Sequence, residues 1–331
     1  MTLWRILLVA TAAEAALLGG LMGLLSLGGE WNAWLDVVNQ FAPFWTAIAL
    51  VGGVAAWACL ARGAQRTAVA AFAAIGIVVG GARVAPDLAL GFAGVVQSPP
   101  RHGSAPLRVM TFNVWSNNPD PAAALRTIAA ASPDVVDLQE YSENFHSQDK
   151  AMQTLYPHRA VCPSDVQSDV EIYTRLPLLA QGCVIVDPSH RLDDPLHFVW
   201  IRVVAPDGKT ATVVTTHMVW PFPPGPQERE LISLAEQLRP LPSDELVLTG
   251  DFNLTPWSAA MGRLDRRLAP LSRRSHALFS WPIYLKPGIR APFAILPIDQ
   301  VFAGRAWRTV LVRRLPRSSS DHYPVLVTLY R

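Results

Sequence analysis

Three long apolar stretches in the first hundred residues constrain the fold more than any other feature of the sequence. They cover Leu3–Leu27, Ala42–Ala61 and Thr67–Ala85. About 20 apolar residues are needed for a helix to cross a bilayer, and each stretch is close to that length. The middle stretch has no charged residue, the first has only Arg5 and Glu14, and the third has only Arg83. The sequence therefore predicts three transmembrane helices within a membrane anchor, residues 1–96.

A cleaved signal peptide is the alternative explanation for the first stretch. A signal peptide has a shorter apolar region, and no small-residue cleavage pattern follows before the next apolar stretch. Glu14 also leaves two explanations open, because an acid inside a membrane is costly. It either has a function there or forms a hydrogen bond with a neighbouring helix.

The loops between the stretches predict the orientation of the chain. The loop Arg62–Arg66 has two arginines, whereas Gly28–Phe41 has Glu30 and Asp36 and no basic residue. Cytoplasmic loops are enriched in Lys and Arg, so the basic loop is predicted to be cytoplasmic. Three crossings then put everything after residue 85 on the opposite side. We expect a multi-pass protein of the cytoplasmic (inner) membrane whose remaining chain is periplasmic or extracellular.

The three cysteines fit this location without proving it. Cys59 lies in the second apolar stretch and is interpreted as a small apolar residue. Cys162 and Cys183 lie in the remaining chain and could pair in an oxidising compartment. The sequence leaves open whether they do.

The composition changes after residues 97–106, a segment rich in Pro, Ser and Gly that we interpret as a linker. Residues 107–331 are then one domain. Runs of β-branched residues alternate there with helical segments, which is typical of an α/β fold with two packed sheets and helices outside them. The predicted helices are Pro121–Ala131, capped by Asp120, and Pro226–Leu238. The predicted strands are Leu107–Val114, Val135–Glu140, Ala211–His217, Glu245–Asp251, Ile298–Phe302, Thr309–Val312 and Val325–Leu329.

Short polar motifs stand at the ends of these strands. In chain order they are Thr111-Phe112-Asn113, Leu138-Gln139-Glu140, Thr216-His217, Gly250-Asp251-Phe252-Asn253, Ile298-Asp299-Gln300 and Ser320-Asp321-His322-Tyr323-Pro324. Strand ends gathered at one edge of a sheet are where α/β folds place their chemistry. One Glu, two Asn, three Asp and two His at such an edge are the inventory of a phosphoesterase that uses a hard metal ion.

Three of these residues are candidate ligands for that ion. Oxygen ligands favour Mg²⁺ or Mn²⁺ over softer metals. Glu140 is the expected anchor ligand, and a purely structural role explains a Glu at the end of an apolar strand poorly. Asn113 could add a carbonyl oxygen or hold the phosphate, and Asp321 could complete the metal site.

The other motif residues are candidates for the chemical step. His322 is the expected base that takes a proton from water, because imidazole titrates near neutral pH, and Asp299 is expected to fix its tautomer. Asp251 and Asn253 lie two positions apart, so on an extended chain they face the same way, to orient the nucleophile and to donate to the phosphate. His217 could stabilise the oxyanion or protonate the leaving group.

Structural explanations stay open for two of these motifs. Asp251 with Asn253 could form an Asx turn after a strand, and Asp299 could cap a turn after Pro297.

The six motifs taken together, in this order, are far more specific than any one of them. Together the motifs resemble the endonuclease/exonuclease/phosphatase superfamily over about residues 107–331. This resemblance implies a four-layer α/β sandwich and divalent-metal hydrolysis of phosphomonoesters or phosphodiesters.

The resemblance also implies roles for the residues that match its motifs. Asn113, Glu140 and Asp321 are similar to the family's metal-side residues, and Asp251 and Asn253 to its phosphate and nucleophile pair. Asp299 with His322 is similar to its Asp–His couple, and His217 to its catalytic histidine. A narrower resemblance, carried by the three helices, GDFNLTPWS, Ser280-Trp281-Pro282 and LPIDQVF, is to membrane-anchored bacterial members associated with teicoplanin resistance.

The sequence also departs from the family pattern. Trp115 stands where the abasic-site enzymes carry a further acid. The segment before Arg175-Leu176-Pro177 fits a family strand, but Glu171 and Thr174 replace a small residue and a Ser. Arg175 is a candidate substrate-binding residue, as is Trp281, which begins a possible apolar contact running through Leu285.

Charge is unevenly distributed within the domain. Residues 107–255 have 10 Lys/Arg and 19 Asp/Glu, whereas residues 256–320 have 12 and 2. The basic part, densest at Arg263, Arg266, Arg267, Arg273 and Arg274, is either a solvated face or a surface that attracts phosphate groups or an anionic membrane.

We therefore predict a membrane-anchored, divalent-metal-dependent phosphoesterase acting outside the cytoplasm, preferably on a lipid-linked phosphate or a phospholipid. The alternative is an extracytoplasmic endonuclease or exonuclease, for which phosphate contacts would dominate binding. A third hypothesis is a non-catalytic binding module, against which the complete set of polar residues argues. Nothing in the sequence indicates an obligate protein partner.

Overall fold

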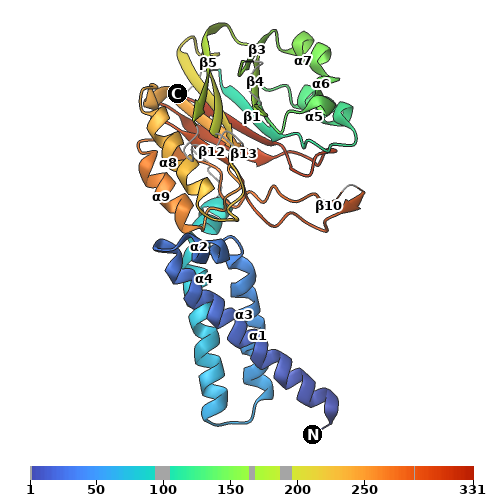
Figure 1. Ribbon diagram of the computed structural model, residues 1–331, viewed down its shortest axis with the longest axis vertical. Coiled ribbons are helices and arrows are strands. Elements are labelled where there is room, and N and C mark those ends of the chain that lie inside the picture. Colours follow the sequence, from blue (N-terminus) through green and yellow to red (C-terminus); the bar gives the residue numbers. More distant parts are fainter. Residues whose placement is uncertain (1, 94–104, 164–167, 187–195, 287) are drawn as a thin grey trace. The chain divides into compact units, whose positions relative to one another are not determined.

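The computed structural model describes residues 2–93, 105–163, 168–186, 196–286 and 288–331 (Figure 1). The predicted linker, 97–106, lies almost wholly outside these residues, so the predicted boundaries on either side of it stay predictions. The chain divides into two compact units. The first contains Met1–Ala89 with two short stretches from later in the chain, Phe222–Pro224 and Thr255–Gly262, and the second contains the rest.

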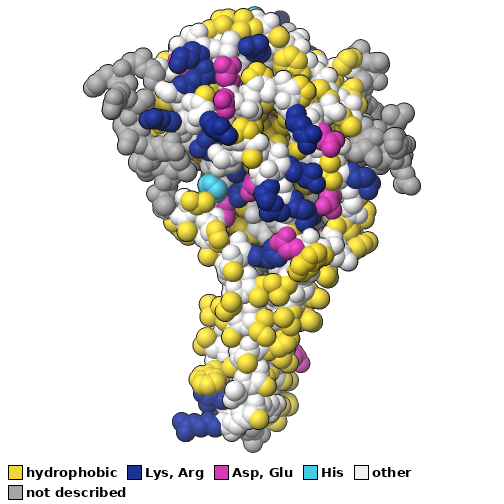
Figure 2. Space-filling view, turned by 90° about the vertical axis from the view of Figure 1, so that its left-hand side faces the viewer, with side chains coloured by type: hydrophobic (Ala, Val, Ile, Leu, Met, Phe, Trp, Pro, Cys, Tyr) yellow, Lys and Arg dark blue, Asp and Glu magenta, His cyan; other side chains and the backbone are white. Residues whose placement is uncertain are grey.

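The first unit is built from helices. Three of them are long and apolar enough to cross a membrane, as predicted. On the face shown in Figure 2, apolar side chains dominate the surface of these helices. The helices of this unit are α1 (Leu3–Leu27), a 3-10 turn (Gly28–Glu30), α2 (Ala33–Asn39), α3 (Ala42–Cys59) and α4 (Ala64–Ala93), whose last residues belong to the second unit.

Small residues let the long helices approach closely. A side chain added at Gly19 would collide with Ala49 of α3, and one at Gly23 would collide with Gly76 of α4. Such small-residue contacts are typical of helices packed in a bilayer. The predicted third stretch covers only part of its helix: α4 begins at Ala64 and continues past Ala85 and Pro86 to Ala93.

The second unit contains two six-stranded sheets. The first has the order β13-β14-β1-β2-β4-β3 and the second has the order β5-β6-β7-β8-β12-β9. Only β1–β2 and β7–β8 pair in parallel among the described strands. The strands of the first sheet are β1 (Leu107–Asn113), β2 (Val135–Gln139), β3 (His158–Val161), β4 (Glu171–Thr174), β13 (Arg308–Arg314) and β14 (Val325–Tyr330). Those of the second are β5 (Leu178–Val186), β6 (Leu196–Val204), β7 (Thr210–His217), β8 (Leu246–Asp251), β12 (Asp299–Ala303) and β9 (Ser272–Arg273).

Helices cover the outer faces of the two sheets, which completes the predicted four-layer sandwich (Figure 1). The central core joins residues of both sheets, such as Val109 of β1 and Val213 of β7. A second core packs Phe112 of β1 against Ile128 of α5. The helices of this unit are α5 (Pro121–Ala131), α6 (Glu143–His146), α7 (Asp149–Leu155), α8 (Pro226–Leu238) and a 3-10 turn (Ser243–Glu245), with α9 (Ala259–Arg267) shared between the two units.

Local sequence explains several of these elements. α5 begins where predicted, and the side chain of Asp120 accepts a hydrogen bond from the Ala123 N–H at its first turn. The predicted β1, β2, β7, β8, β12, β13 and β14 agree with the observed strands to within two residues at each end. β5 and β6 had not been predicted, and neither had the hairpin of β10 (Tyr284–Lys286) and β11 (Ile289–Arg290), which extends away from the sheets in Figure 1.

Cys162 and Cys183 form a disulfide, which the sequence had left open. It joins the end of β3, an edge strand of the first sheet, to β5, an edge strand of the second. The bond closes a separation of 21 residues. It therefore ties the two sheets together at one side of the sandwich.

Candidate active site

The predicted site residues meet because parallel and antiparallel pairing bring their strand ends to one edge. Asn113 at the end of β1 pairs with Gln139 of β2, and Glu140 follows directly. In the second sheet Asp251 pairs with His217 on one side and with Asp299 on the other. The central carboxylate of β8 is thus flanked by a histidine and an acid from its two neighbouring strands.

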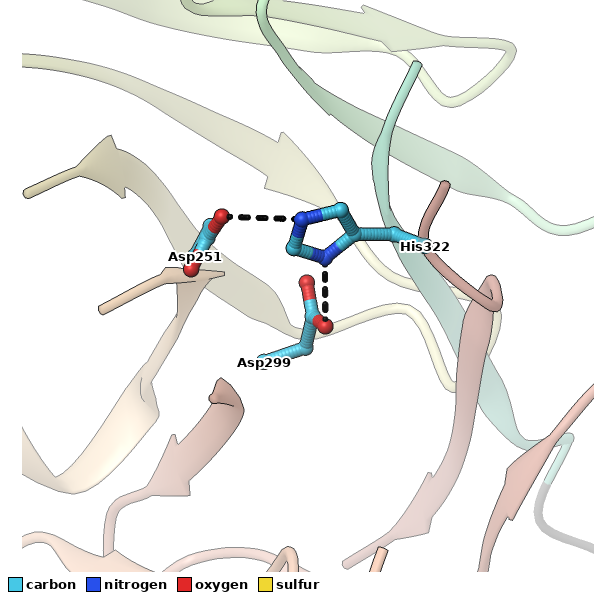
Figure 3. A group of neighbouring side chains, drawn as sticks. All are labelled: Asp251, Asp299 and His322. Atoms are coloured by element: carbon cyan, nitrogen blue, oxygen red, sulfur yellow. Dashed lines mark hydrogen bonds and ion pairs between the residues drawn. The ribbon is translucent and has the colours of Figure 1, made fainter. Parts of the chain in front are cut away.

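His322 completes this group from the loop before β14 (Figure 3). Its Nδ1 lies 2.9 Å from Oδ2 of Asp299, and its Nε2 lies 3.4 Å from Oδ2 of Asp251. The ring thus lies between two carboxylates, and all three side chains are buried. Ser320 orients the loop, since its hydroxyl donates to the carbonyl oxygen of Asn113 and accepts from the backbone N–H of His322.

Charge compensation governs the ionisation of this group. Burial alone would lower the pKa of His322, but the carboxylates of Asp299, Asp251 and Asp321 outweigh it and hold that pKa well above its ordinary value. Burial raises the pKa of Asp251 to about 6, although His322 opposes the shift. The buried imidazole and its acids therefore form a charge-compensated unit, which is how a protein keeps ionised groups away from water.

A second histidine–carboxylate pair lies beside the first. Nδ1 of His217 is 2.5 Å from Oδ2 of Asp169, and its Nε2 is 3.8 Å from Oδ2 of Asp251. Burial would lower the pKa of His217, but Asp169, Asp251 and Glu140 raise it to about 10. Asp169 was not among the predicted site residues. Asp169 lies just before β4 begins, whereas the predicted motifs stand at strand ends. The only feature of the sequence that could have indicated it is its position in the segment that leads to Arg175.

Glu140 and Asn113 connect the two sheets at the site. Asn113 Nδ2 donates to Glu140 Oε1 at 2.9 Å and to Asp251 Oδ2 at 3.0 Å, while its Oδ1 accepts from the Trp115 N–H. In this arrangement the Asn113 side-chain amide positions two carboxylates through its NH2 group, while its carbonyl oxygen accepts one backbone N–H. The predicted roles of Asn113, as a carbonyl ligand or as a phosphate contact, stay predictions. Glu140 Oε2 also accepts from the Ser116 N–H.

The residues present fit a divalent cation at Glu140 and Asp321. Oδ1 of Asp321 is buried without a hydrogen-bond partner among the described residues, while Oδ2 accepts from Trp281 Nε1 at 3.0 Å. Burial raises the pKa of Asp321, and the nearby charge of Glu140 raises it further. Hydrogen bonds from Ser116 and Asn113, in contrast, outweigh burial and lower the pKa of Glu140. Two carboxylates whose charges influence each other, one of them with an unsatisfied oxygen, are a suitable donor set for Mg²⁺ or Mn²⁺.

Asp251, Asp299 and His322 are a second group that could hold a metal ion. Their ligand atoms lie within 4.8 Å of one another, and all three residues are buried. A metal-bound imidazole nitrogen must be deprotonated, however. The carboxylates around His322 favour its protonated form. We therefore regard Glu140 and Asp321 as the better candidate ligands.

The backbone is strained at three positions around the site. Trp115, Glu140 and Asn253 adopt the left-handed conformation, with φ of 62°, 53° and 47°. Non-glycine residues in this region cost energy and are concentrated at functional sites. Asn253 Nδ2 donates to the Met218 carbonyl and lies 3.3 Å from His217 Nε2. The Asx turn that the sequence left open is also present, because Asp251 Oδ1 accepts from the Asn253 N–H.

Gly250 has a specific steric reason to be glycine. Its φ is 150°, and a Cβ at this position would run into the backbone oxygen of Thr216 on β7. The parallel pairing of β7 with β8 needs this close approach at the pair that precedes His217 and Asp251. The glycine of the Gly250-Asp251-Phe252-Asn253 motif therefore serves strand pairing.

Arg175 is not part of the site. It follows β4, which runs antiparallel to β2, so Arg175 lies at the Val135 end of β2, opposite Glu140. Its guanidinium donates to Ser132 and Tyr156 there. The structure therefore does not bring Arg175 together with the other predicted site residues, because sequence adjacency to a family motif did not reveal the strand direction. Glu171, at the other end of β4, forms a bidentate ion pair with Arg159.

Trp281, in contrast, lies at the site among other aromatic rings. Its ring centroid is 6.5 Å from that of His322 and 5.4 Å from that of Trp220. Trp115 stacks on Tyr284 of β10, with centroids 5.9 Å apart. Trp220, Leu285 and Phe293 are each more than half exposed. Trp115, Trp220, Trp281 and Tyr284 therefore form an aromatic rim beside the acidic site, and the exposed apolar side chains of Leu285 and Phe293 belong to the same segment of the chain as Trp281 and Tyr284.

The basic part of the domain is largely engaged in structural contacts. Arg263 pairs with Glu228, Arg273 pairs with Asp265, and Arg274 donates to the Trp307 carbonyl oxygen. Arg266 and Arg267, at the last turn of α9, are exposed. Figure 2 shows Lys and Arg side chains scattered among acids on this unit. Contacts within the protein therefore account for three of the five arginines, and the solvated-face explanation fits Arg266 and Arg267.

The comparisons with known proteins agree with this geometry. The sequence profile of the Endonuclease/Exonuclease/phosphatase family matches residues 110–322. The fold is similar to that of D. rerio TDP2 complexed with a single-strand DNA product, with 18% identity and a TM-score of 0.57, covering 69% of this chain and 100% of that one. It is also similar to an endonuclease/exonuclease/phosphatase from Beutenbergia cavernae, with 20% identity, a TM-score of 0.53 and coverage of 68% and 71%.

A third similar structure is the human Nocturnin catalytic domain with bound sulfate, with 16% identity, a TM-score of 0.52 and coverage of 69% and 96%. The sequence has no significant match among curated proteins. At these identities the structural likeness concerns the fold. The match to the family profile covers well over half of the chain and includes nearly every residue of the site.

Proposed function

Because the chain belongs to the endonuclease/exonuclease/phosphatase family, we propose that it is a membrane-anchored, divalent-metal-dependent phosphoesterase. Its preferred substrate is a lipid-linked phosphate or a phospholipid on the outer side of the cytoplasmic membrane. The observation that carries the proposal is the meeting of two histidine–carboxylate pairs at Asp251. Asp299 pairs with His322 and Asp169 pairs with His217, and both rings reach toward the same carboxylate.

The two histidines can divide the acid and base roles of hydrolysis. In its neutral form His322 accepts the proton of a water molecule as that water attacks phosphorus, and Asp299 holds its Nδ1 and compensates the charge that forms. Asp251, 3.4 Å from His322 Nε2, orients the water. As the bond between phosphorus and the leaving oxygen breaks, His217 supplies a proton to that oxygen. Its raised pKa keeps it protonated at neutral pH, which suits this role.

A divalent cation would be held by Glu140 and Asp321 and would supply positive charge to the phosphoryl oxygens. It would also offset part of the carboxylate field that keeps His322 protonated. Asn113 donates to the carboxylates of both Glu140 and Asp251 and so holds them in position at the site. Asn253, whose amide lies beside His217, is the expected donor to the phosphate.

The surroundings of the site favour a lipid over a nucleic acid. Three helices suited to a membrane tether the enzyme, and the aromatic rim, together with the exposed side chains of Leu285 and Phe293, offers a contact for an acyl or prenyl chain. A nuclease would instead need a continuous basic path for the phosphate backbone. Most of the basic cluster is already paired within the protein, which weakens the nuclease alternative.

The disulfide supports a location outside the cytoplasm. Cytosolic reductants keep thiols reduced, so a pair such as Cys162 and Cys183 persists in an oxidising compartment. This agrees with the orientation predicted from the basic loop at Arg62–Arg66. Protease added to intact spheroplasts should therefore cleave the catalytic domain. If cleavage requires membrane rupture, the proposed orientation is wrong.

The activity is tested with the full-length protein in detergent or nanodiscs and Mg²⁺ or Mn²⁺. Phosphate or nucleotide release would be measured from a polyprenyl diphosphate, sphingomyelin, single-stranded DNA and plasmid DNA. We expect turnover of a lipid substrate that is abolished by EDTA and by His322→Ala. His158→Ala, which changes a half-buried histidine of edge strand β3, is the matched control and should retain activity.

Two outcomes would favour the alternatives. Turnover of DNA with no turnover of lipid, falling steeply as salt increases, would make the protein a nuclease. A folded protein that shows no metal-dependent turnover of any substrate in the panel would favour the non-catalytic binding module and overturn the proposed activity.

A further inference from the structure

The first compact unit contains a contact that joins the anchor to the chain just beyond the catalytic motif. The short helix α2 lies between the first two long helices in the sequence, and Thr255–Gly262 begins two residues after Asn253. Both belong to this unit. Asp36, Asn39 and Gln40 from α2 and its end are buried, as are Thr255, Trp257 and Ser258. Buried polar groups on both sides indicate a built contact.

Asp36 provides the acid that helix α9 lacks. Its Oδ1 accepts from the Ala259 N–H at 2.7 Å and its Oδ2 accepts from the Ala260 N–H at 2.8 Å. The first turn of α9 contains no acidic residue of its own. The hydroxyl of Ser258 accepts from the next N–H, that of Met261. A helix leaves its first N–H groups without intrahelical partners, and a negative charge there is stabilising.

Gln40 holds the residues just before α9. Its Oε1 accepts from both the N–H and the hydroxyl of Thr255, each at 3.0 Å, and its backbone oxygen accepts from Trp257 Nε1 at 3.1 Å. Five hydrogen bonds therefore run from the segment Thr255–Ala260 to Asp36 and Gln40. All five place their acceptors on the anchor side.

The anchor braces these acceptors in turn. Asn39 Nδ2 donates to Asp36 Oδ1 at 2.7 Å, and Asn39 Oδ1 accepts from the hydroxyl of Ser26 near the end of α1. Arg83 of α4 donates to the Ser26 carbonyl oxygen. The network thus extends from two long helices through Asn39 to Asp36. The order of the helices allows this contact. If the three long helices cross a membrane, α2 and the chain after α4 lie on the same side of it.

We propose that Asp36 and Gln40 are positioning residues that fix the far end of the catalytic loop carrying Asp251 and Asn253. β8 fixes the near end of this loop, and Asn253 has the strained left-handed backbone within it. A strained residue persists only when the structure on both sides constrains it. The anchor is then a working part of the catalytic unit as well as a tether, and a change in the packing of its helices would reach the loop through α2.

Hydrogen exchange tests the contact without any substrate. In the full-length protein in nanodiscs, Asp36→Asn keeps the size of the side chain but removes one of its two acceptors. We expect whichever of the Ala259 and Ala260 amides faces the new NH2 group to exchange about 10-fold faster, because that amide loses its acceptor oxygen. Gln40→Leu should similarly expose Thr255, whereas Gln40→Glu, which keeps an acceptor oxygen, should restore protection. Glu143→Gln, which changes an exposed acid in the first turn of α6, is the control.

Kinetics test the catalytic consequence, which rests on the proposed phosphoesterase activity. Asp36→Asn and Gln40→Leu should lower kcat about 10-fold and change KM for a short-chain substrate less than 2-fold, and Gln40→Glu should recover kcat. Unchanged exchange at residues 255–260 in both loss variants would overturn the contact. Faster exchange with unchanged kcat would make it structural only. If the wild-type protein shows no turnover, both the proposed function and this catalytic consequence are wrong. Hydrogen exchange at Thr255–Ala260 would still show whether α2 holds that segment.

Discussion

Nδ1 of His322 lies 2.9 Å from Oδ2 of Asp299, although the two residues are 23 positions apart in the sequence. Both side chains are buried, and Asp299 is the first residue of β12. The acid therefore approaches the ring from a rigid strand. A buried carboxylate held in this way can fix the ring orientation and stabilise the imidazolium that forms when the ring takes a proton.

Replacing Asp299 should slow the chemical step without abolishing folding. Asp299→Asn keeps the shape but loses the charge that compensates His322, and we expect kcat to fall about 100-fold. His322→Ala should cost at least as much, and the double variant should be no worse than His322→Ala alone, because the two residues act as one unit. Additive losses in steady-state kinetics would show that Asp299 acts independently of His322.

Asp169 should control the alkaline limb of the pH profile. His217 has a pKa of about 10 and is protonated below that pH, with Asp169 as the first of the carboxylates that raise it. Asp169→Asn removes that charge, so the pKa of His217 falls and its protonated fraction at pH 8–9 decreases. If His217 supplies a proton to the leaving oxygen, kcat of the variant should decline at a lower pH than kcat of the wild type.

Asp120→Asn is a suitable control for that profile, because Asn caps a helix about as well as Asp. Asp120 is an exposed N-cap residue outside the site. Its replacement should leave the profile unchanged. An unshifted alkaline limb in Asp169→Asn would rule out His217 as the proton donor.

Asp137 should make the catalytic domain less stable as the pH rises. Its carboxyl is buried, accepts a hydrogen bond from the Thr249 hydroxyl at 2.5 Å, and has a pKa raised by burial from 3.8 to about 8. Between pH 3.8 and about pH 8 the folded state therefore keeps this proton, whereas the unfolded state has lost it. The stability contributed by this retention is complete below pH 3.8 and is lost as the pH rises through 8.

Asp137→Asn removes this titration and keeps a polar side chain of the same size. At pH 7 the variant should be more stable than the wild type, by at most about 4 kcal/mol. Melting temperatures of the two proteins between pH 4 and pH 8 would measure the effect. We expect the wild-type melting temperature to fall with pH relative to that of the variant, and parallel curves would contradict the assignment.

Removing the disulfide should destabilise the sandwich. The bond between Cys162 and Cys183 closes a separation of 21 residues, for which loop entropy predicts a loss of about 3 kcal/mol in the double Cys→Ser variant. Thermal unfolding of wild type and variant, with and without a reductant, would measure it. Cys59→Ser, at the exposed cysteine of α3, should have no such effect, and reductant should not lower the melting temperature of the double variant further.

Features that depend only on neighbouring residues could be predicted from local patterns in the sequence. Hydropathy over about 20 residues predicted the three long helices, and β-branched runs predicted the strands that carry Asn113, His217 and Asp251. The cap of Asp120 at α5 is also a local signal. The helices, the strands and the cap are present because a long apolar helix, a buried strand or a helix cap is encoded within a short stretch of the chain, and whether the long helices cross a membrane stays a prediction.

Contacts between residues far apart in the sequence could not be predicted from such patterns and are seen in the folded chain. In the fold His217 contacts Asp169, and the side-chain carbonyl oxygen of Asn113 accepts from the Trp115 N–H. Arg175 lies at the end of β2 opposite Glu140. The fold also brings Asp36 to the first turn of α9, a contact between residues 223 positions apart. Strand order, strand direction and register determine which of these residues come into contact. These three properties result from packing over the whole chain, so no local pattern in the sequence encodes the contacts.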